Sequence, residues 1–113
     1  MATILAVPIT RVGIAGTLVP ASVAGDEFAC TGAEFIEIVN ADAVPHTATL
    51  DIIPTVDGQP VTDRAVVIPA GARRIIGPFA PSVYRNPANG RAKVTLEAVT
   101  LVTIGVFSLT PQS

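Results

Sequence analysis

Residue types that usually carry catalysis or bind metals are scarce in this chain. Its 113 residues include one histidine, one cysteine and no tryptophan, and only 14% are charged. One histidine and one cysteine cannot supply a copper site built from two histidines and a cysteine, nor the four nitrogen or sulfur ligands of a structural zinc. A single cysteine also excludes a disulfide within the chain. The sequence therefore predicts no metal and no cofactor.

Charge is also low, and it does not favour a polyanionic partner. Seven Lys and Arg residues stand against nine Asp and Glu, a net charge of −2, so there is no basic surface for nucleic acid. The N-terminal residues M-A-T-I-L-A-V-P-I-T-R lack the charged segment and cleavage site of a signal peptide. The longest uncharged run, residues 98–113, contains Thr, Ser and Pro and is too short to span a bilayer. We expect a protein that is made in the cytoplasm and has no membrane partner.

Candidates for catalysis are few and poorly spaced. A Cys30–His46 pair would be the one possible nucleophile and base. A lone cysteine in an apolar chain is more often a small buried hydrophobe, and we expect His46 at a strand edge on the face that carries the threonines. A pair of catalytic carboxylates is not predicted either. Glu34 and Glu37 would face opposite sides of a strand, and Glu97 is far from both in the sequence. The sequence predicts that the protein is not an enzyme.

Hydrophobic residues recur with a period of two. In H-T-A-T-L-D-I-I (residues 46–53) and A-K-V-T-L-E-A (residues 92–98), apolar and polar side chains alternate, which is typical of half-buried antiparallel strands. Residues 102–107 are apolar on both faces, so that strand should be central or covered.

Ten prolines and nine glycines divide the chain into short segments and disfavour long helices. Asp57-Gly58 and Asn89-Gly90 indicate turns, and residues 19–33 read as an irregular loop. We predict one all-β domain over residues 1–113, an antiparallel β-sandwich or small β-barrel of about eight short strands. The expected strands are residues 2–7, 12–18, 34–40, 46–53, 63–68, 72–77, 91–98 and 102–109.

The composition indicates association with other chains. Apolar residues make up 50% of the sequence, and so few charges cannot cover the surface of a small domain, which should leave apolar surface for a subunit or partner. Most of the phenylalanines are expected in the core. Tyr84-Arg85, in S-V-Y-R-N-P-A-N-G-R, is the aromatic–arginine pair expected to be exposed, a combination that is enriched at protein interfaces.

Arg73 and Arg74 are adjacent between two aliphatic runs, in V-V-I-P-A-G-A-R-R-I-I-G-P-F. Ile68-Pro69-Ala70-Gly71 fits a type I turn, so the stretch reads as a hairpin. On a strand the two arginines point to opposite faces and cannot form one clamp. We expect one to be solvated and the other to pair with a carboxylate or carbonyl, from this chain or a partner.

Four stretches carry a family resemblance. They are V-I-P-A-G-A-R-R-I-I-G-P-F, N-P-A-N-G-R-A-K-V-T-L, V-T-L-V-T-I-G-V-F-S-L and A-G-D-E-F-A-C-T-G-A-E-F-I-E-I-V-N-A-D. Together these stretches, over about residues 20–110, resemble small β-rich structural proteins of tailed bacteriophages, among them head-associated and capsid decoration proteins.

The resemblance implies a virion structural protein without catalytic residues. It would be made in the host cytoplasm, bind the major capsid protein on the outside of the head and stabilise the shell, commonly as a homotrimer. Many weak contacts on one lattice add up through avidity. A tail or head–tail connector subunit is an alternative, and a receptor- or carbohydrate-binding β-sandwich is another. The shortage of exposed aromatics counts against sugar binding.

The N-terminal segment is a further candidate interface. Residues 1–10 include Ile4, Leu5 and Val7, a strand-like composition interrupted by Pro8, and proline is tolerated in edge strands. The segment is either an extended arm that adds an edge strand to the capsid protein or a neighbouring subunit, or the first strand of its own sandwich.

Overall fold

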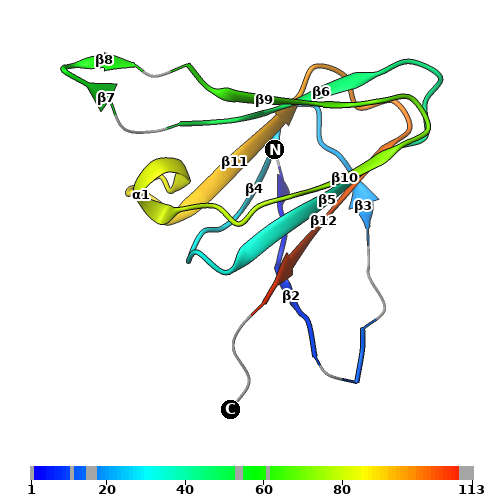
Figure 1. The fold of residues 1–113 in the computed structure, drawn as a ribbon, viewed down its shortest axis with the longest axis horizontal. Coiled ribbons are helices and arrows are strands. Elements are labelled where there is room, and N and C mark those ends of the chain that lie inside the picture. The colour runs from blue at the N-terminus through cyan, green and yellow to red at the C-terminus, as the bar shows by residue number, and fades with distance from the viewer. Residues whose placement is uncertain (1, 11, 15–17, 53–54, 61, 110–113) are drawn as a thin grey trace.

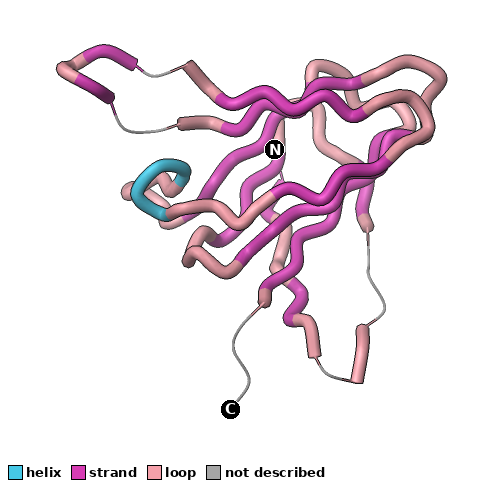
Figure 2. Tube along the Cα trace, viewed as in Figure 1, coloured by secondary structure: helices cyan, strands magenta, loops and turns pink. Residues whose placement is uncertain are grey.

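The computed structural model describes residues 2–10, 12–14, 18–52, 55–60 and 62–109. Over these residues the chain forms short strands and one four-residue helix, α1 (Pro81–Tyr84). Figure 2 shows strands joined by loops and turns, with one short helix. No helical segment in the described ranges has the length and apolar character needed to cross a membrane.

Most of the strands belong to one of two larger sheets. The first has the order β1 (Ala2–Thr3), β4 (Asp26–Ala29), β11 (Arg91–Leu96), β6 (His46–Leu50), β9 (Arg64–Ile68). The second has the order β10 (Arg73–Ile76), β5 (Glu34–Asn40), β12 (Val102–Ser108), β2 (Val7–Pro8), with β3 (Val19–Pro20) also paired to β12. Pairing is antiparallel except for β1 with β4 and β2 with β12.

The core lies between the sheets because the inward positions of their strands are apolar. In β5, β6 and β11 every second residue is buried, as the period of two requires. Phe28, Ile36, Ile38, Leu50 and Ile104 are completely buried. The predicted all-β antiparallel sandwich is confirmed, with two separate sheets instead of a closed barrel.

Six predicted strands correspond to β5, β6, β9, β10, β11 and β12. The strand expected over residues 2–7 is instead two short strands, β1 and β2, one on each sheet. The strand expected over residues 12–18 is wrong for residues 12–14 and 18, which are not in a strand, and residues 15–17 lie outside the described residues.

The prediction of an irregular loop over residues 19–33 is also wrong, because this region contains β3 and β4. The inward side chains of β4 are Asp26 and Phe28, so a carboxylate occupies a position where the pattern requires an apolar residue. The N–H of Ser22 donates to Asp26 Oδ2 at 3.1 Å, whereas the buried Oδ1 has no hydrogen-bond partner among the described residues.

The hairpin predicted for residues 66–79 is wrong, because β9 and β10 belong to different sheets. The turn between them begins at Pro69, one residue later than expected. The N–H of Ala72 donates to the carbonyl of Pro69 at 3.1 Å, and Gly71 has φ +69°. The chain therefore crosses from one sheet to the other at this turn, and β9 and β10 diverge from it (Figure 1).

A projecting arm leaves the sandwich between β6 and β9. At its tip β7 (Thr55–Val56) pairs with β8 (Gln59–Pro60), and Figure 1 shows this hairpin well away from both sheets. Asp57 and Gly58 both have positive φ, +52° and +76°, so the turn predicted from Asp-Gly is confirmed. Residues 87–90 also form the expected turn.

Candidate functional site

Arg73 and Arg74 lie at the start of β10, the edge strand of the second sheet. Their register partners on β5 are Val39 for Arg73 and the buried Ile38 for Arg74. The two side chains therefore leave the strand on opposite faces. Arg73 is 71% exposed, and its Nη1 lies 3.4 Å from Glu37 Oε2 of the same chain.

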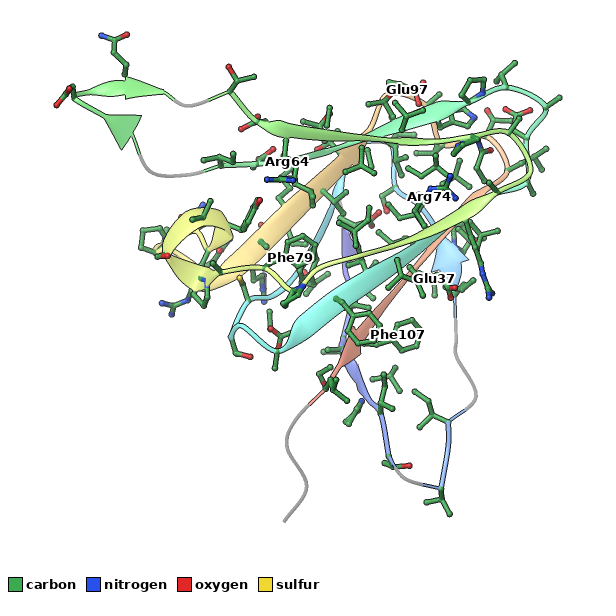
Figure 3. All side chains as sticks on the ribbon, viewed as in Figure 1. Glu37, Arg64, Arg74, Phe79, Glu97 and Phe107 are labelled. Atoms are coloured by element: carbon green, nitrogen blue, oxygen red, sulfur yellow. The ribbon has the colours of Figure 1, made fainter. Side chains whose placement is uncertain are left out.

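Arg74 points toward the interior face of its sheet, into a cleft between the diverging edges of β9 and β10. We call this the arginine cleft. Its volume is about 430 Å³. Figure 3 shows Arg64 from one sheet and Arg74 from the other, both directed into this opening. The cleft is lined by Arg64, Val66, Arg74, Ile75, Ile76, Gly77, Pro78, Phe79 and Tyr84.

The arginine cleft has no negative charge in its lining. In the described part of the chain, neither Arg64 nor Arg74 forms an ion pair. Arg64 Nε donates to the hydroxyl of Tyr84 at 3.0 Å, and Arg74 Nη1 donates to the carbonyl of Arg73 at 2.8 Å. A guanidinium carries five N–H donors, so most donors of both groups face the cleft or solvent.

Three aromatic rings pack in a row beside Arg64 and anchor this side of the cleft to the core. The rings of Tyr84 and Phe79 meet edge to face at 5.4 Å, and Phe79 packs on Phe28 at 5.3 Å. Phe28 and Phe79 are buried, so Tyr84 is anchored to the core. The expected exposed Tyr84–Arg85 pair is wrong in part, because Arg85 is exposed but Tyr84 is half-buried.

The opposite side of β10 carries an apolar hollow that the sequence did not indicate. We call it the apolar shelf. It has a volume of about 370 Å³ and is lined by Gly32, Ala33, Phe35, Ile75, Gly77, Pro78 and Leu109. Phe35 packs on Phe107 with ring centres 5.8 Å apart. Ile75 and Leu109 remain 63% and 61% exposed, so this edge of the second sheet presents apolar side chains to solvent.

The N-terminal segment pairs within its own chain. Besides the pairing of β1 and β2, the N–H of Ile4 donates to the carbonyl of Glu27 at 2.8 Å. Ile4 packs against the core and Val7 is half-buried beside Phe107. Residues 2–10 thus contribute two short strands, one to each sheet of their own sandwich. Leu5 is 83% exposed and is free for contact.

His46 is buried, which contradicts the expected position on the threonine face. It lies on the same side of β6 as Ala48 and Leu50. Its Nδ1 is 2.9 Å from Glu97 Oε1, and its Nε2 is 3.0 Å from Asp42 Oδ2. The two carboxylates satisfy both ring nitrogens and so make burial of the imidazole tolerable. Glu97 is 51 residues away in the sequence, and Asp42 lies outside β6, four residues before His46. The alternation of residues along β6 could therefore reveal neither partner.

The three groups shift one another's pKa. The hydrogen bond to Asp42 raises the pKa of His46 against the opposing effect of burial, and the bond to Glu97 raises it further. The bond from His46 lowers the pKa of Asp42, with help from the N–H of Ala43. Burial raises the pKa of Glu97, but the N–H of Thr47 and the imidazole outweigh it and hold this pKa below its ordinary value. The cluster is therefore a hydrogen-bonded network in which both carboxylates favour the protonated form of His46.

Cys30 is buried, as expected for a small hydrophobe, and its Sγ donates to the carbonyl of Phe79 at 3.6 Å. Both nitrogens of His46 are bound to carboxylates, so the imidazole has no hydrogen bond left for a cysteine. Among the described residues there is no group of three or more His, Cys, Asp or Glu side chains placed to hold a metal ion.

Comparisons with protein-family models, with curated proteins and with solved structures gave no match to this chain.

Proposed function

We propose that this protein is a virion structural protein, a capsid decoration protein that binds the major capsid protein of a tailed bacteriophage and stabilises the head as a homotrimer. The resemblance of its sequence to such proteins supports the proposal. The structural observation that carries it is the apolar shelf at the free edge of the second sheet, where Ile75 and Leu109 are exposed beside Phe35.

The apolar shelf favours association for energetic reasons. Full burial of one aliphatic side chain stabilises a contact by about 1.5–3 kcal/mol, and exposed apolar surface of this kind is typical of interfaces. We assign the shelf to the contact between neighbouring copies of the trimer. Each trimer then presents several identical surfaces to the capsid lattice, which multiplies a weak contact through avidity.

Light scattering after size-exclusion chromatography tests the trimer. We expect a trimer for the native chain and a monomer for Ile75→Asp, because the new carboxylate would be buried without a partner. Val67→Asp is the matched control. Val67 lies on the other edge strand, β9, and is 57% exposed, so this variant should remain trimeric. A monomeric native protein would refute the trimer, and a hexamer would favour the connector alternative.

Binding to purified empty capsids tests the decoration role itself. We expect saturable binding with a fixed number of copies for each capsomer, and an increase in the temperature at which the shell opens. Absence of binding at saturating protein would refute the role. Leu5→Asp examines the N-terminal segment without disturbing β1 or β2, because Leu5 points into solvent. Unchanged capsid binding by this variant would exclude Leu5 as a capsid contact.

A further inference from the structure

We propose that the arginine cleft binds an extended, acidic segment of a partner polypeptide, with carboxylate side chains paired to Arg64 and Arg74. This site adjoins the apolar shelf, with which it shares Ile75, Gly77 and Pro78, but Arg64 and Arg74 line the arginine cleft and not the shelf. The proposal does not depend on a role in the capsid, because the binding of a peptide can be measured with the isolated protein.

Charge selects the occupant. The two guanidiniums come from different sheets and line one cleft that contains no carboxylate, while the chain as a whole has a net charge of −2. The cleft is thus a local positive site on a slightly acidic protein. Planar guanidiniums bind carboxylates through paired, charge-assisted hydrogen bonds. Arg73, on the opposite face of β10, differs from Arg64 and Arg74 because it already pairs with a carboxylate of its own chain, that of Glu37.

Backbone geometry selects an extended segment. The cleft lies between β9 and β10, and each is the terminal strand of its sheet among the described residues. Terminal strands present unpaired backbone N–H and C=O groups, which can pair with an added strand. A segment placed here would continue a sheet along one of the two strands, which diverge from their shared turn (Figure 1).

The interior of the cleft suits alternating side chains. Val66 and Ile76 are half-buried, and Phe79 is buried at its base. Arg64 and Val66 share one face of β9, and Arg74 and Ile76 share one face of β10, because residues two apart on a strand face the same side. An added strand could therefore present both acidic and apolar side chains to the cleft from every second position, on one of its faces. Nucleic acid fits less well. Two arginines are few for a phosphate backbone, and the ring of Tyr84 is held edge-on to Phe79 instead of lying free for stacking.

Arg64 is positioned in advance of binding. Its Nε is held by the hydroxyl of Tyr84, and Tyr84 rests on buried Phe79. An arginine that is already ordered loses less conformational entropy when it binds a carboxylate. Tyr84 therefore acts as a positioning residue for Arg64.

Fluorescence polarisation with labelled octapeptides tests the proposal. The probe is an alternating Thr/Val octapeptide in which two Val positions, four residues apart, are replaced by Glu, so that Glu and Val share one face, and the control peptide has Gln at both positions. We expect the Glu peptide to bind and the Gln peptide to bind at least about tenfold more weakly, since hydrogen bonds between charged groups each contribute about 1.5–3 kcal/mol. Moving the Glu pair along the octapeptide covers the possible registers.

The protein variants assign binding to the cleft. Arg64→Gln and Arg74→Gln should each weaken binding of the Glu peptide by about fivefold to tenfold. Arg73→Gln is the matched control, because it removes the same charge from the adjacent position on the opposite face, and it should leave binding unchanged. Tyr84→Phe, which keeps the ring and removes the hydroxyl, should weaken binding less than Arg64→Gln does.

Three results would overturn the proposal. The first is no preference for Glu over Gln peptides in any register. The second is an equal loss of binding in Arg73→Gln, which would indicate non-specific charge attraction. The third is complete competition by glutarate or inorganic phosphate at the concentration of the peptide, which would indicate a site for small anions instead of a polypeptide. Circular dichroism of each variant verifies that it is folded.

Discussion

The imidazole of His46 lies 2.9 Å from the carboxylate of Glu97, a residue 51 positions away in the sequence. Glu97 follows β11, and its Oε1 also accepts the N–H of Thr47 at 2.8 Å. On the other side of the ring, Asp42 comes from the segment after β5. His46 therefore ties together two chain segments that connect different sheets at the same end of the sandwich.

Titration of His46 by NMR should give a pKa above the ordinary value for histidine, because two carboxylates stabilise the imidazolium. Asp42→Asn should lower this pKa more than Glu97→Gln, since the hydrogen bond to Asp42 is the largest cause of the shift. An equal or opposite ranking of the two variants would contradict this assignment. His46 is the one histidine of the chain, so its resonances are identified directly.

Stability should depend on pH through the same cluster. The pKa of His46 is raised on folding, so its contribution is complete below about pH 6.5 and is lost as pH rises through the folded-state pKa. The pKa values of Asp42 and Glu97 are lowered, so their contribution is lost as pH falls below about 4. Urea unfolding should show a decrease in stability from pH 6 to pH 8.5 that is absent in His46→Gln. The same decrease in that variant would refute the link.

Asn40 should be among the most sensitive polar residues of the fold. Its side chain is completely buried, its Nδ2 donates to the carbonyls of Val44 at 2.9 Å and Ile68 at 3.1 Å, and its Oδ1 accepts the N–H of Asp42. Asn40→Ala leaves these buried groups unpaired, and we expect a loss of about 2–4 kcal/mol in the free energy of unfolding.

The matched control for Asn40 is Asn89→Ala. Asn89 also forms side-chain hydrogen bonds, to Glu27 and to the N–H of Arg91, but it is exposed. Water can replace its bonds, so the loss should be below about 1 kcal/mol. Equal effects of the two substitutions in urea unfolding would show that burial of Asn40 does not decide its importance.

Gly77 should not tolerate a side chain. It has φ +139°, and an added Cβ would lie 2.7 Å from Cβ of Phe35 and 2.9 Å from its Cα. We expect Gly77→Ala to reduce the free energy of unfolding by about 2–4 kcal/mol through strain and steric overlap.

Gly71→Ala serves as the comparison for Gly77. Gly71 has φ +69° with nothing within 4 Å of an added Cβ, so that variant should lose about 1 kcal/mol, the cost of a left-handed conformation alone. Thermal unfolding of both variants distinguishes steric overlap from backbone strain. The same loss in both would exclude the contact with Phe35 as the cause.

Cys30 should resist thiol reagents while the protein is folded. Burial raises the pKa of its thiol, and the nearby carboxylate of Glu34 raises it further against the opposing charge of Arg85. Because the thiolate is the reactive form, we expect slow reaction with Ellman's reagent at pH 8 and complete reaction within seconds in denaturant. Rapid modification of the native protein would contradict the buried position of the side chain.

Much of the strand pattern could be predicted from local sequence. Alternation of apolar and polar residues places β6 and β11 within a few positions, because a strand with one buried face must repeat every two residues. The same rule separates Arg73 from Arg74. The apolar run over residues 102–107 places β12. The turn at Asp57-Gly58 could also be predicted, because the ability to adopt a positive φ depends on the type of the residue itself.

The predictions from sequence fail where residues that are not neighbours on the same strand determine whether a side chain is buried. Asp26 faces inward on β4 and interrupts the apolar pattern, and His46 is buried because Glu97 reaches it from across the fold. No local pattern contains this information, because the free energy of burying a polar group depends on which groups surround it.

Local sequence is enough to predict the all-β class, the positions of the long strands and the opposite directions of Arg73 and Arg74. It does not predict that β9 and β10 belong to different sheets, and this arrangement forms the cleft lined by Arg64 and Arg74 in place of a hairpin. Strand order depends on which faces pack into a common core, a property of the whole chain, whereas alternation and turn formation depend on neighbouring residues.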